Sequence, residues 1–177
     1  MKTQPQSDSS VWKGMAAGLV AGLAASYVMN QFQSGLSALL SNGEQSKAKE
    51  KEKQEQGGNK EPATVKAAEA ISETVANHEL TREEKKVAGP VMHYAMGATS
   101  GAVYGLAAEL EPYFASASGL PFGAAVWFLA DEVAVPSLGL SGPPSETPVS
   151  NHLEALASHF VYGVTTDVLR RAIRKAL

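Results

Sequence analysis

The sequence predicts an all-α fold, a polytopic membrane helix bundle with about four transmembrane helices. The chain has 177 residues with 15 Lys+Arg, yet no Lys or Arg occurs between residues 87 and 169. Three uncharged runs, 14–43, 87–108 and 112–130, approach or exceed the roughly 20 residues that a helix needs to cross a bilayer. Glycines recur at every fourth position in two of these runs, a pattern typical of closely packed membrane helices.

The composition excludes several classes of protein. A formal net charge of −3 gives no electrostatic reason to bind nucleic acid, and the absence of Cys excludes disulfides, thiolate metal sites and a Cys nucleophile. The uncharged runs are rich in Gly, Ala and Ser rather than in large apolar residues. Such small side chains would stabilise a soluble core poorly, because the hydrophobic contribution scales with buried apolar area. The lipid bilayer is therefore the expected partner of these helices.

The N-terminal part predicts a loose polar tail over 1–10 and a first transmembrane helix over 11–33, with Trp12 and Lys13 at the membrane edge. A cleaved signal peptide is the alternative interpretation. The apolar pattern continues past any Ala-rich cleavage site to Phe32, which favours a retained helix.

A charged, partly helical loop is predicted over 34–90. Pro62 is suited to the start of one helix within this loop. Thr81 and Glu84 have the spacing of a capping box, which predicts the start of another helix.

The remaining chain divides into three further helices, a loop and a tail. Pro121 suits the first turn of the third span, whereas the fourth span is the weakest because it contains two carboxylates. The basic residues before the first span and after the last predict that both termini are cytoplasmic. The predicted elements are transmembrane helix 2 over 91–110, transmembrane helix 3 over 114–135, a Pro/Gly loop over 136–150, transmembrane helix 4 over 151–169 and a basic C-terminal tail over 170–177.

The glycine spacing predicts a glycine zipper between helices. A period of four keeps these residues on one helix face, where a second backbone can approach closely. We expect the packing to lie within the chain, with self-association as the alternative. The predicted helix-packing residues are Gly14, Gly18, Gly22, Gly97, Gly101, Gly105, Gly119 and Gly123.

Ionisable residues at membrane depth are costly and therefore mark candidate sites. Headgroup placement of the carboxylates and simple packing of the histidines remain open alternatives. Haem or metal binding would need His93 paired with His152 or His159, since the last two lie roughly 10 Å apart on one helix. We assign no catalytic residue, cofactor or metal. The candidate polar or proton-site residues are His93, Glu109, Asp131, Glu132, His152 and His159.

Four segments carry a family resemblance: GMAAGLVAGLAASYVMNQFQ, HYAMGATSGAVYG, LPFGAAVWFLADEVAVPSLGL and HLEALASHFVYGVTTDVLRR. Over 11–33 and 91–172 the chain resembles the YagU-like family of uncharacterised bacterial inner-membrane proteins. The resemblance implies a small multi-span protein of the inner membrane with no assigned enzymatic activity, and it supplies no catalytic residues.

The sequence has glycine spacings that favour close helix packing and no set of residues spaced for catalysis. These two observations predict a non-enzymatic inner-membrane protein. It would act through helix packing and association, as a homo-oligomer, within a larger membrane assembly, or in envelope stress. The first alternative is a small proton or ion pathway, or a pH-responsive protein, that uses the intramembrane His and carboxylate residues. The second alternative is haem or metal binding through paired His.

Overall fold

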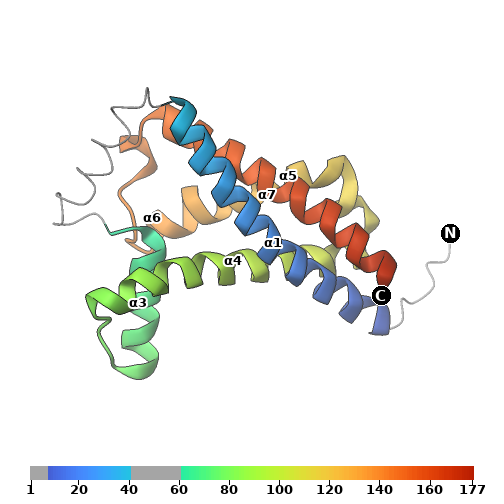
Figure 1. Ribbon diagram of the computed structural model, residues 1–177, viewed down its shortest axis with the longest axis horizontal. Coiled ribbons are helices and arrows are strands. Elements are labelled where there is room, and N and C mark those ends of the chain that lie inside the picture. The colour runs from blue at the N-terminus through green and yellow to red at the C-terminus, as the bar shows by residue number, and fades with distance from the viewer. Residues whose placement is uncertain (1–7, 41–60) are drawn as a thin grey trace.

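The computed structural model describes residues 8–40 and 61–177, and this part of the chain is helical without strands. Of the three long helices, α1 (Asp8–Leu40) packs on both α4 (Arg82–Leu110) and α7 (Val149–Ala176), and α4 diverges from α7 (Figure 1). The shorter elements are α3 (Ala63–Ala76), η1 (Pro112–Gly119), α5 (Leu120–Trp127), η2 (Phe128–Ala134), α6 (Val135–Ser137) and η3 (Pro144–Glu146). Helix α3 packs on α4, and α5 packs on α7.

Helix α1 runs antiparallel to both α4 and α7. Gly14, near the start of α1, lies against Gly105 near the end of α4, and Lys13 Nζ donates a 2.6 Å hydrogen bond to the carbonyl oxygen of Leu177. The start of α1 and the ends of α4 and α7 thus meet at one end of the bundle, which we call the terminal end. The opposite end, with α3 and the segment 138–148, is called the loop end.

Two segments among the described residues are long and apolar enough to cross a membrane, Ser10–Leu39 and Tyr113–Ser137. The two spans predicted within α4 and α7 do not pass the same test of length and composition. Only 39% and 11% of the two apolar segments are buried inside the protein, so most of their apolar surface faces outward.

The span predicted over 114–135 lies within the apolar segment Tyr113–Ser137, but its helix is divided in the structure rather than continuous. Ala117 and Ser118 have φ of 51° and 53°, and Gly119 has φ of 78°. The last residues of η1 therefore form a left-handed turn before α5. Ser and Gly favour such turns over helix, and Gly119 adopts this φ without steric cost. The next helix starts at Leu120 with Pro121 in its first turn, as the sequence predicts. A π-helical stretch, η2, follows and contains the adjacent acidic residues Asp131 and Glu132.

Three other boundaries differ from the predictions. Helix α1 continues to Leu40 rather than ending at 33, and α4 starts at Arg82 and runs through Pro90 rather than starting at 91. Helix α7 continues to Ala176, so the predicted tail over 170–177 is mostly its last turns. Arginine side chains in these turns bond to other elements, as described below, and such contacts hold the helix end in place.

The capping box predicted at Thr81 is confirmed. Thr81 Oγ1 accepts a hydrogen bond from the Glu84 backbone N–H, and the Glu84 carboxylate accepts a 2.7 Å hydrogen bond from the Thr81 N–H. These bonds satisfy N–H groups that a helix start otherwise leaves without partners. The same box explains why α4 begins well before the membrane-length apolar run.

Acidification is expected to loosen this helix start. The Thr81 backbone N–H, the Thr81 hydroxyl and His78 lower the pKa of Glu84 from 4.5 to about 2. A carboxylate with a lowered folded-state pKa stabilises the fold above pH 4.5, and this contribution disappears as the pH falls toward 2. A ¹³C NMR titration of the Glu84 carboxyl should therefore give a midpoint near 2, and Thr81→Ala should move it toward 4.5. A wild-type midpoint at 4.5 would contradict the capping account.

Most buried side chains are small or polar, with Met29, Val65, Tyr104 and Tyr162 as larger buried residues, whereas many large apolar side chains are exposed. Ala17, Ala21 and Ala25 of α1 are fully buried. The buried polar or charged residues are Ser26, Ser158, His159, Thr166, Asp167 and Arg170. Exposed large apolar residues occur on each long helix and on η2, among them Leu19, Leu23, Val103, Phe128, Leu129 and Val168.

Candidate functional site

Glycines of α1 and α4 bring the two backbones into contact. A β-carbon added to Gly18 would overlap the carbonyl oxygen of Gly101 and lie 2.9 Å from Gly105 Cα. A β-carbon on Gly22 would overlap the carbonyl oxygen of Gly97, and one on Gly14 would overlap the Glu109 side chain. Six of the eight predicted packing glycines, those of α1 and α4, thus lie at the α1–α4 contact.

A second close contact joins α5 to α7. A β-carbon on Gly119 would overlap the carbonyl oxygen of Gly163, and one on Gly123 would overlap that of His159. A β-carbon on Gly163 would in turn lie 2.7 Å from the Gly123 nitrogen. Sequence reasoning missed Gly163 because it is a single glycine without a partner four residues away.

An ionic cluster occupies the terminal end, and we call it the arginine cluster: Ser10, Glu109, Asp167, Arg170, Arg171 and Arg174. Glu109 accepts hydrogen bonds from Arg174 Nε at 2.9 Å and from Ser10 Oγ at 2.8 Å. The cluster therefore links α1, α4 and α7 at the terminal end, where α1 begins and α7 ends.

Asp167 is the most deeply buried charge in this cluster, with 1% of the residue exposed. Its carboxylate lies 2.8 Å from Arg171 Nη2 and 3.6 Å from Arg170 Nη2, and it accepts a 2.8 Å hydrogen bond from Tyr104. The Arg170 guanidinium also lies over the Tyr104 ring, 5.6 Å from its centre.

Only Glu109 of this cluster was among the predicted site residues. The signal that could have found the rest is an Asp three and four residues before two arginines on one helix.

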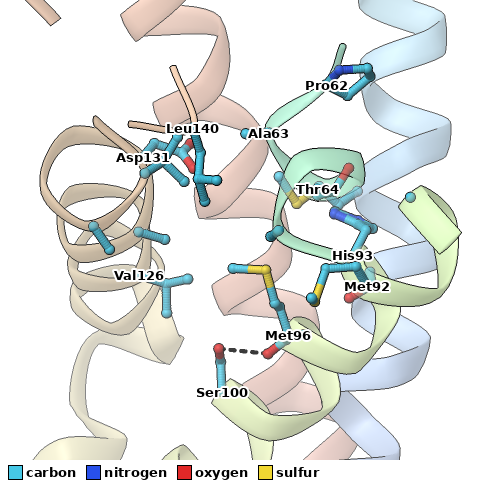
Figure 2. Close-up of a pocket in the computed structure, with 18 of the residues that line it drawn as sticks. Pro62, Ala63, Thr64, Met92, His93, Met96, Ser100, Val126, Asp131 and Leu140 are labelled. Carbon is cyan, nitrogen blue, oxygen red and sulfur yellow. Dashed lines mark hydrogen bonds between the residues drawn. The ribbon is translucent and has the colours of Figure 1, made fainter. Parts of the chain in front are cut away.

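A groove of about 800 Å³ opens at the loop end of the bundle. Residues of α1 and α4 form one wall and residues of α5, η2 and α6 the other, with α7 at its base and the first turn of α3 at its mouth. Figure 2 shows His93, Met92 and Met96 of α4 facing Val126 and Asp131 across this space. The size lies in the range of small-molecule sites, which are typically 300–1,000 Å³.

Three of the six predicted polar residues line this groove: His93, Asp131 and His159. His159 Nδ1 lies 2.9 Å from the carbonyl oxygen of Ala155 and 3.7 Å from Asp131 Oδ2. Because a carbonyl only accepts, Nδ1 carries a proton and gives it to Ala155. His93 Nε2 is buried and has no hydrogen-bond partner within the described chain.

The other three predicted residues lie elsewhere. Glu132 and His152 form a pair of their own, with His152 Nδ1 2.5 Å from Glu132 Oε1, beside a smaller cavity of about 140 Å³. Glu109 belongs to the arginine cluster. The adjacent carboxylates Asp131 and Glu132 thus have different partners, as expected for neighbours that point about 100° apart on a helix.

The described residues hold no group of three or more His, Asp or Glu side chains placed to bind one metal ion. His93 and His159 share the groove, whereas His152 is engaged by Glu132 and by the carbonyl oxygen of Pro144. Of the two histidine pairs that the haem alternative requires, His93 with His159 is the one whose members line the same space.

Comparison with known proteins gives one match. A family model described as a protein of unknown function (DUF1440) matches residues 54–168. No curated protein and no solved structure matches the chain.

Proposed function

We propose that this chain, which belongs to the DUF1440 family of proteins of unknown function, is a non-enzymatic, four-span protein of the bacterial inner membrane. The observation that carries the proposal is the distribution of side chains. Buried positions hold mainly Gly, Ala, Ser and Thr, with a few charges and a few larger side chains such as Met29, Tyr104 and Tyr162, and the exterior carries many large apolar residues. In water such an exterior would be unfavourable, whereas in lipid small residues permit close helix packing and apolar side chains suit the surroundings.

The helix directions support the four-span arrangement. Two apolar segments, in α1 and from η1 to α6, have the length and composition of spans. Helices α4 and α7 both run opposite to α1, and α5 runs opposite to α7, so the four segments alternate in direction along the chain. The charged residues of α4 and α7 lie toward their ends. The basic residues Lys13, Arg170, Arg171 and Arg174 all lie at the terminal end, which supports a cytoplasmic location for both termini. The resemblance to YagU-like proteins fits this placement.

We further propose that the protein acts through association, as a homo-oligomer or within a larger membrane assembly, with envelope stress as the setting. The α1–α4 glycine faces already contact each other within the chain. Association would therefore use the outer apolar surface of α1, where Leu19, Leu23 and Tyr27 are exposed.

Topology reporters test the membrane arrangement directly. Green fluorescent protein fused to either terminus should fluoresce, and alkaline phosphatase inserted near residue 57 should be active. Alkaline phosphatase activity at only one of the two termini would contradict an even number of spans. An inactive enzyme near residue 57 would contradict the crossing of the membrane by α1.

A second candidate function, a proton pathway or pH-responsive site, is favoured by the meeting of His93, Asp131 and His159 in one groove. Histidine titrates near neutral pH, so a groove with two histidines and a carboxylate can hold or release protons in the physiological range.

Proton flux into liposomes that contain the purified protein tests this second candidate. Asp131→Asn and His159→Asn should each lower the protein-dependent flux, whereas His152→Gln should leave it unchanged because His152 lies beside the other cavity. Equal flux with and without protein, or an equal loss in all three variants, would overturn the proton pathway.

A further inference from the structure

The groove presents one carboxylate to an otherwise mainly apolar space. The Asp131 side chain is 39% exposed, and it makes no hydrogen bond to the described residues. Its nearest basic atom is His159 Nδ1 at 3.7 Å, and the proton on that nitrogen is already given to the carbonyl oxygen of Ala155. A carboxylate in apolar surroundings is disfavoured without a charged partner, and Asp131 has only this long contact with His159, which is charged only when its ring is protonated.

Among the described groove lining, the side chain that can give Asp131 a positive partner is His159, and only when its ring is protonated. The lining contains no Lys or Arg. Glu132, the adjacent residue, adds negative charge nearby and is already paired with His152. On the facing wall His93 also lines the groove, and its buried Nε2 has no hydrogen-bond partner among the described residues.

The other lining residues suit the apolar part of a ligand. Met29, Met96, Val126 and Leu138 line the space between α1, α4 and the η2 wall. Methionine adapts its shape to irregular apolar ligands, and sulfur contacts aromatic rings favourably. A volume of about 800 Å³ is large enough for a drug-sized molecule.

We propose that this groove binds a lipophilic organic cation, with Asp131 as its counter-ion and the methionine-lined walls around its apolar body. An apolar molecule without charge would leave Asp131 with His159 as its nearest basic partner, and an inorganic cation would leave the apolar walls unfilled. The proposal rests on the groove of the second candidate function, but it requires no transport of protons.

The test uses tetraphenylphosphonium and the full-length protein in lipid nanodiscs. Equilibrium dialysis should show saturable binding near one ion per chain, and the neutral triphenylphosphine oxide should not compete. Asp131→Asn should weaken binding about 30-fold or more, as expected when one partner of a desolvated charge pair is removed. Glu154→Gln, which removes an exposed carboxylate outside the groove lining, should bind like the wild type.

A measurement on the wild-type protein covers the case in which Asp131→Asn does not fold. Dicyclohexylcarbodiimide modifies carboxyl groups in apolar sites, and tetraphenylphosphonium should slow its reaction with Asp131 about tenfold when present at about ten times its Kd. Absence of saturable binding, equal binding by Asp131→Asn, or unprotected modification would each overturn the proposal. These outcomes leave the topology and proton-flux results standing, so failure of this inference is distinguishable from failure of the proposed function.

Discussion

Replacing Gly101 by Ala is expected to lower the free energy of unfolding by about 1–3 kcal/mol or more, the range for overpacking of a close contact. The new β-carbon would overlap the carbonyl oxygen of Gly18 and lie 2.7 Å from Gly22 Cα. Backbone atoms cannot rotate away as a flexible side chain would, so α1 and α4 must separate. Thermal unfolding of the purified protein in detergent, followed by circular dichroism, measures the effect.

Gly35→Ala is the matched control for this substitution. Gly35 also lies in helix α1, but a β-carbon there would meet nothing within 4 Å. Because Ala favours helix over Gly by about 1 kcal/mol, this variant should be as stable as the wild type or slightly more stable. If both alanine variants unfold at the same temperature, close contact between the α1 and α4 backbones is not what holds these helices together.

Replacing Asp167 by Asn should have the second large effect, a loss of about 3–5 kcal/mol in the free energy of unfolding, since removing one partner of a buried ion pair leaves the other charge uncompensated. Arg170 is 6% exposed and would keep one carboxylate partner among the described residues, Glu109 at 3.7 Å from its Nη1, besides its contact with the Tyr104 ring. We expect the remaining cluster to hold part of the structure, because Glu109 still bonds to Arg174 and Ser10. The same unfolding assay measures this loss.

Glu83→Gln gives the comparison for an exposed ion pair. Glu83 lies 2.8 Å from Lys86, but the two side chains are 78% and 65% exposed. Solvent screening makes such a pair worth less than about 1 kcal/mol, so this variant should change stability little. Equal losses from Asp167→Asn and Glu83→Gln would show that burial of the arginine cluster contributes nothing to the fold.

The local features of the fold were predictable because they depend on near neighbours in the chain. The start of α4 follows from Thr81 and Glu84, three residues apart, and the start of α5 from Pro121. The break at Ala117 and Ser118 was not predictable in the same way. A run of small residues is compatible with a membrane helix, and the left-handed turn forms where Gly119 meets Gly163 of α7.

The sites depend on contacts between residues far apart in sequence. His93 and Asp131 were chosen because ionisable groups are costly in lipid, but their common groove depends on how α4 and η2 diverge around α7. Asp167 pairs with Tyr104 across 63 positions, and Arg174 with Glu109 across 65. Sequence periodicity carries no information on such partners, so the arginine cluster was assigned to a membrane span and a tail.

Extraction of the natural membrane with alkaline carbonate and then with detergent tests the central claim, that lipid surrounds this bundle. The exposed apolar side chains on α1, α4, α7 and η2 predict that the protein stays with the membrane in carbonate and leaves it only in detergent. It should then lose helical structure or aggregate when the detergent is removed. A helical monomer that stays dissolved in plain buffer would contradict the account.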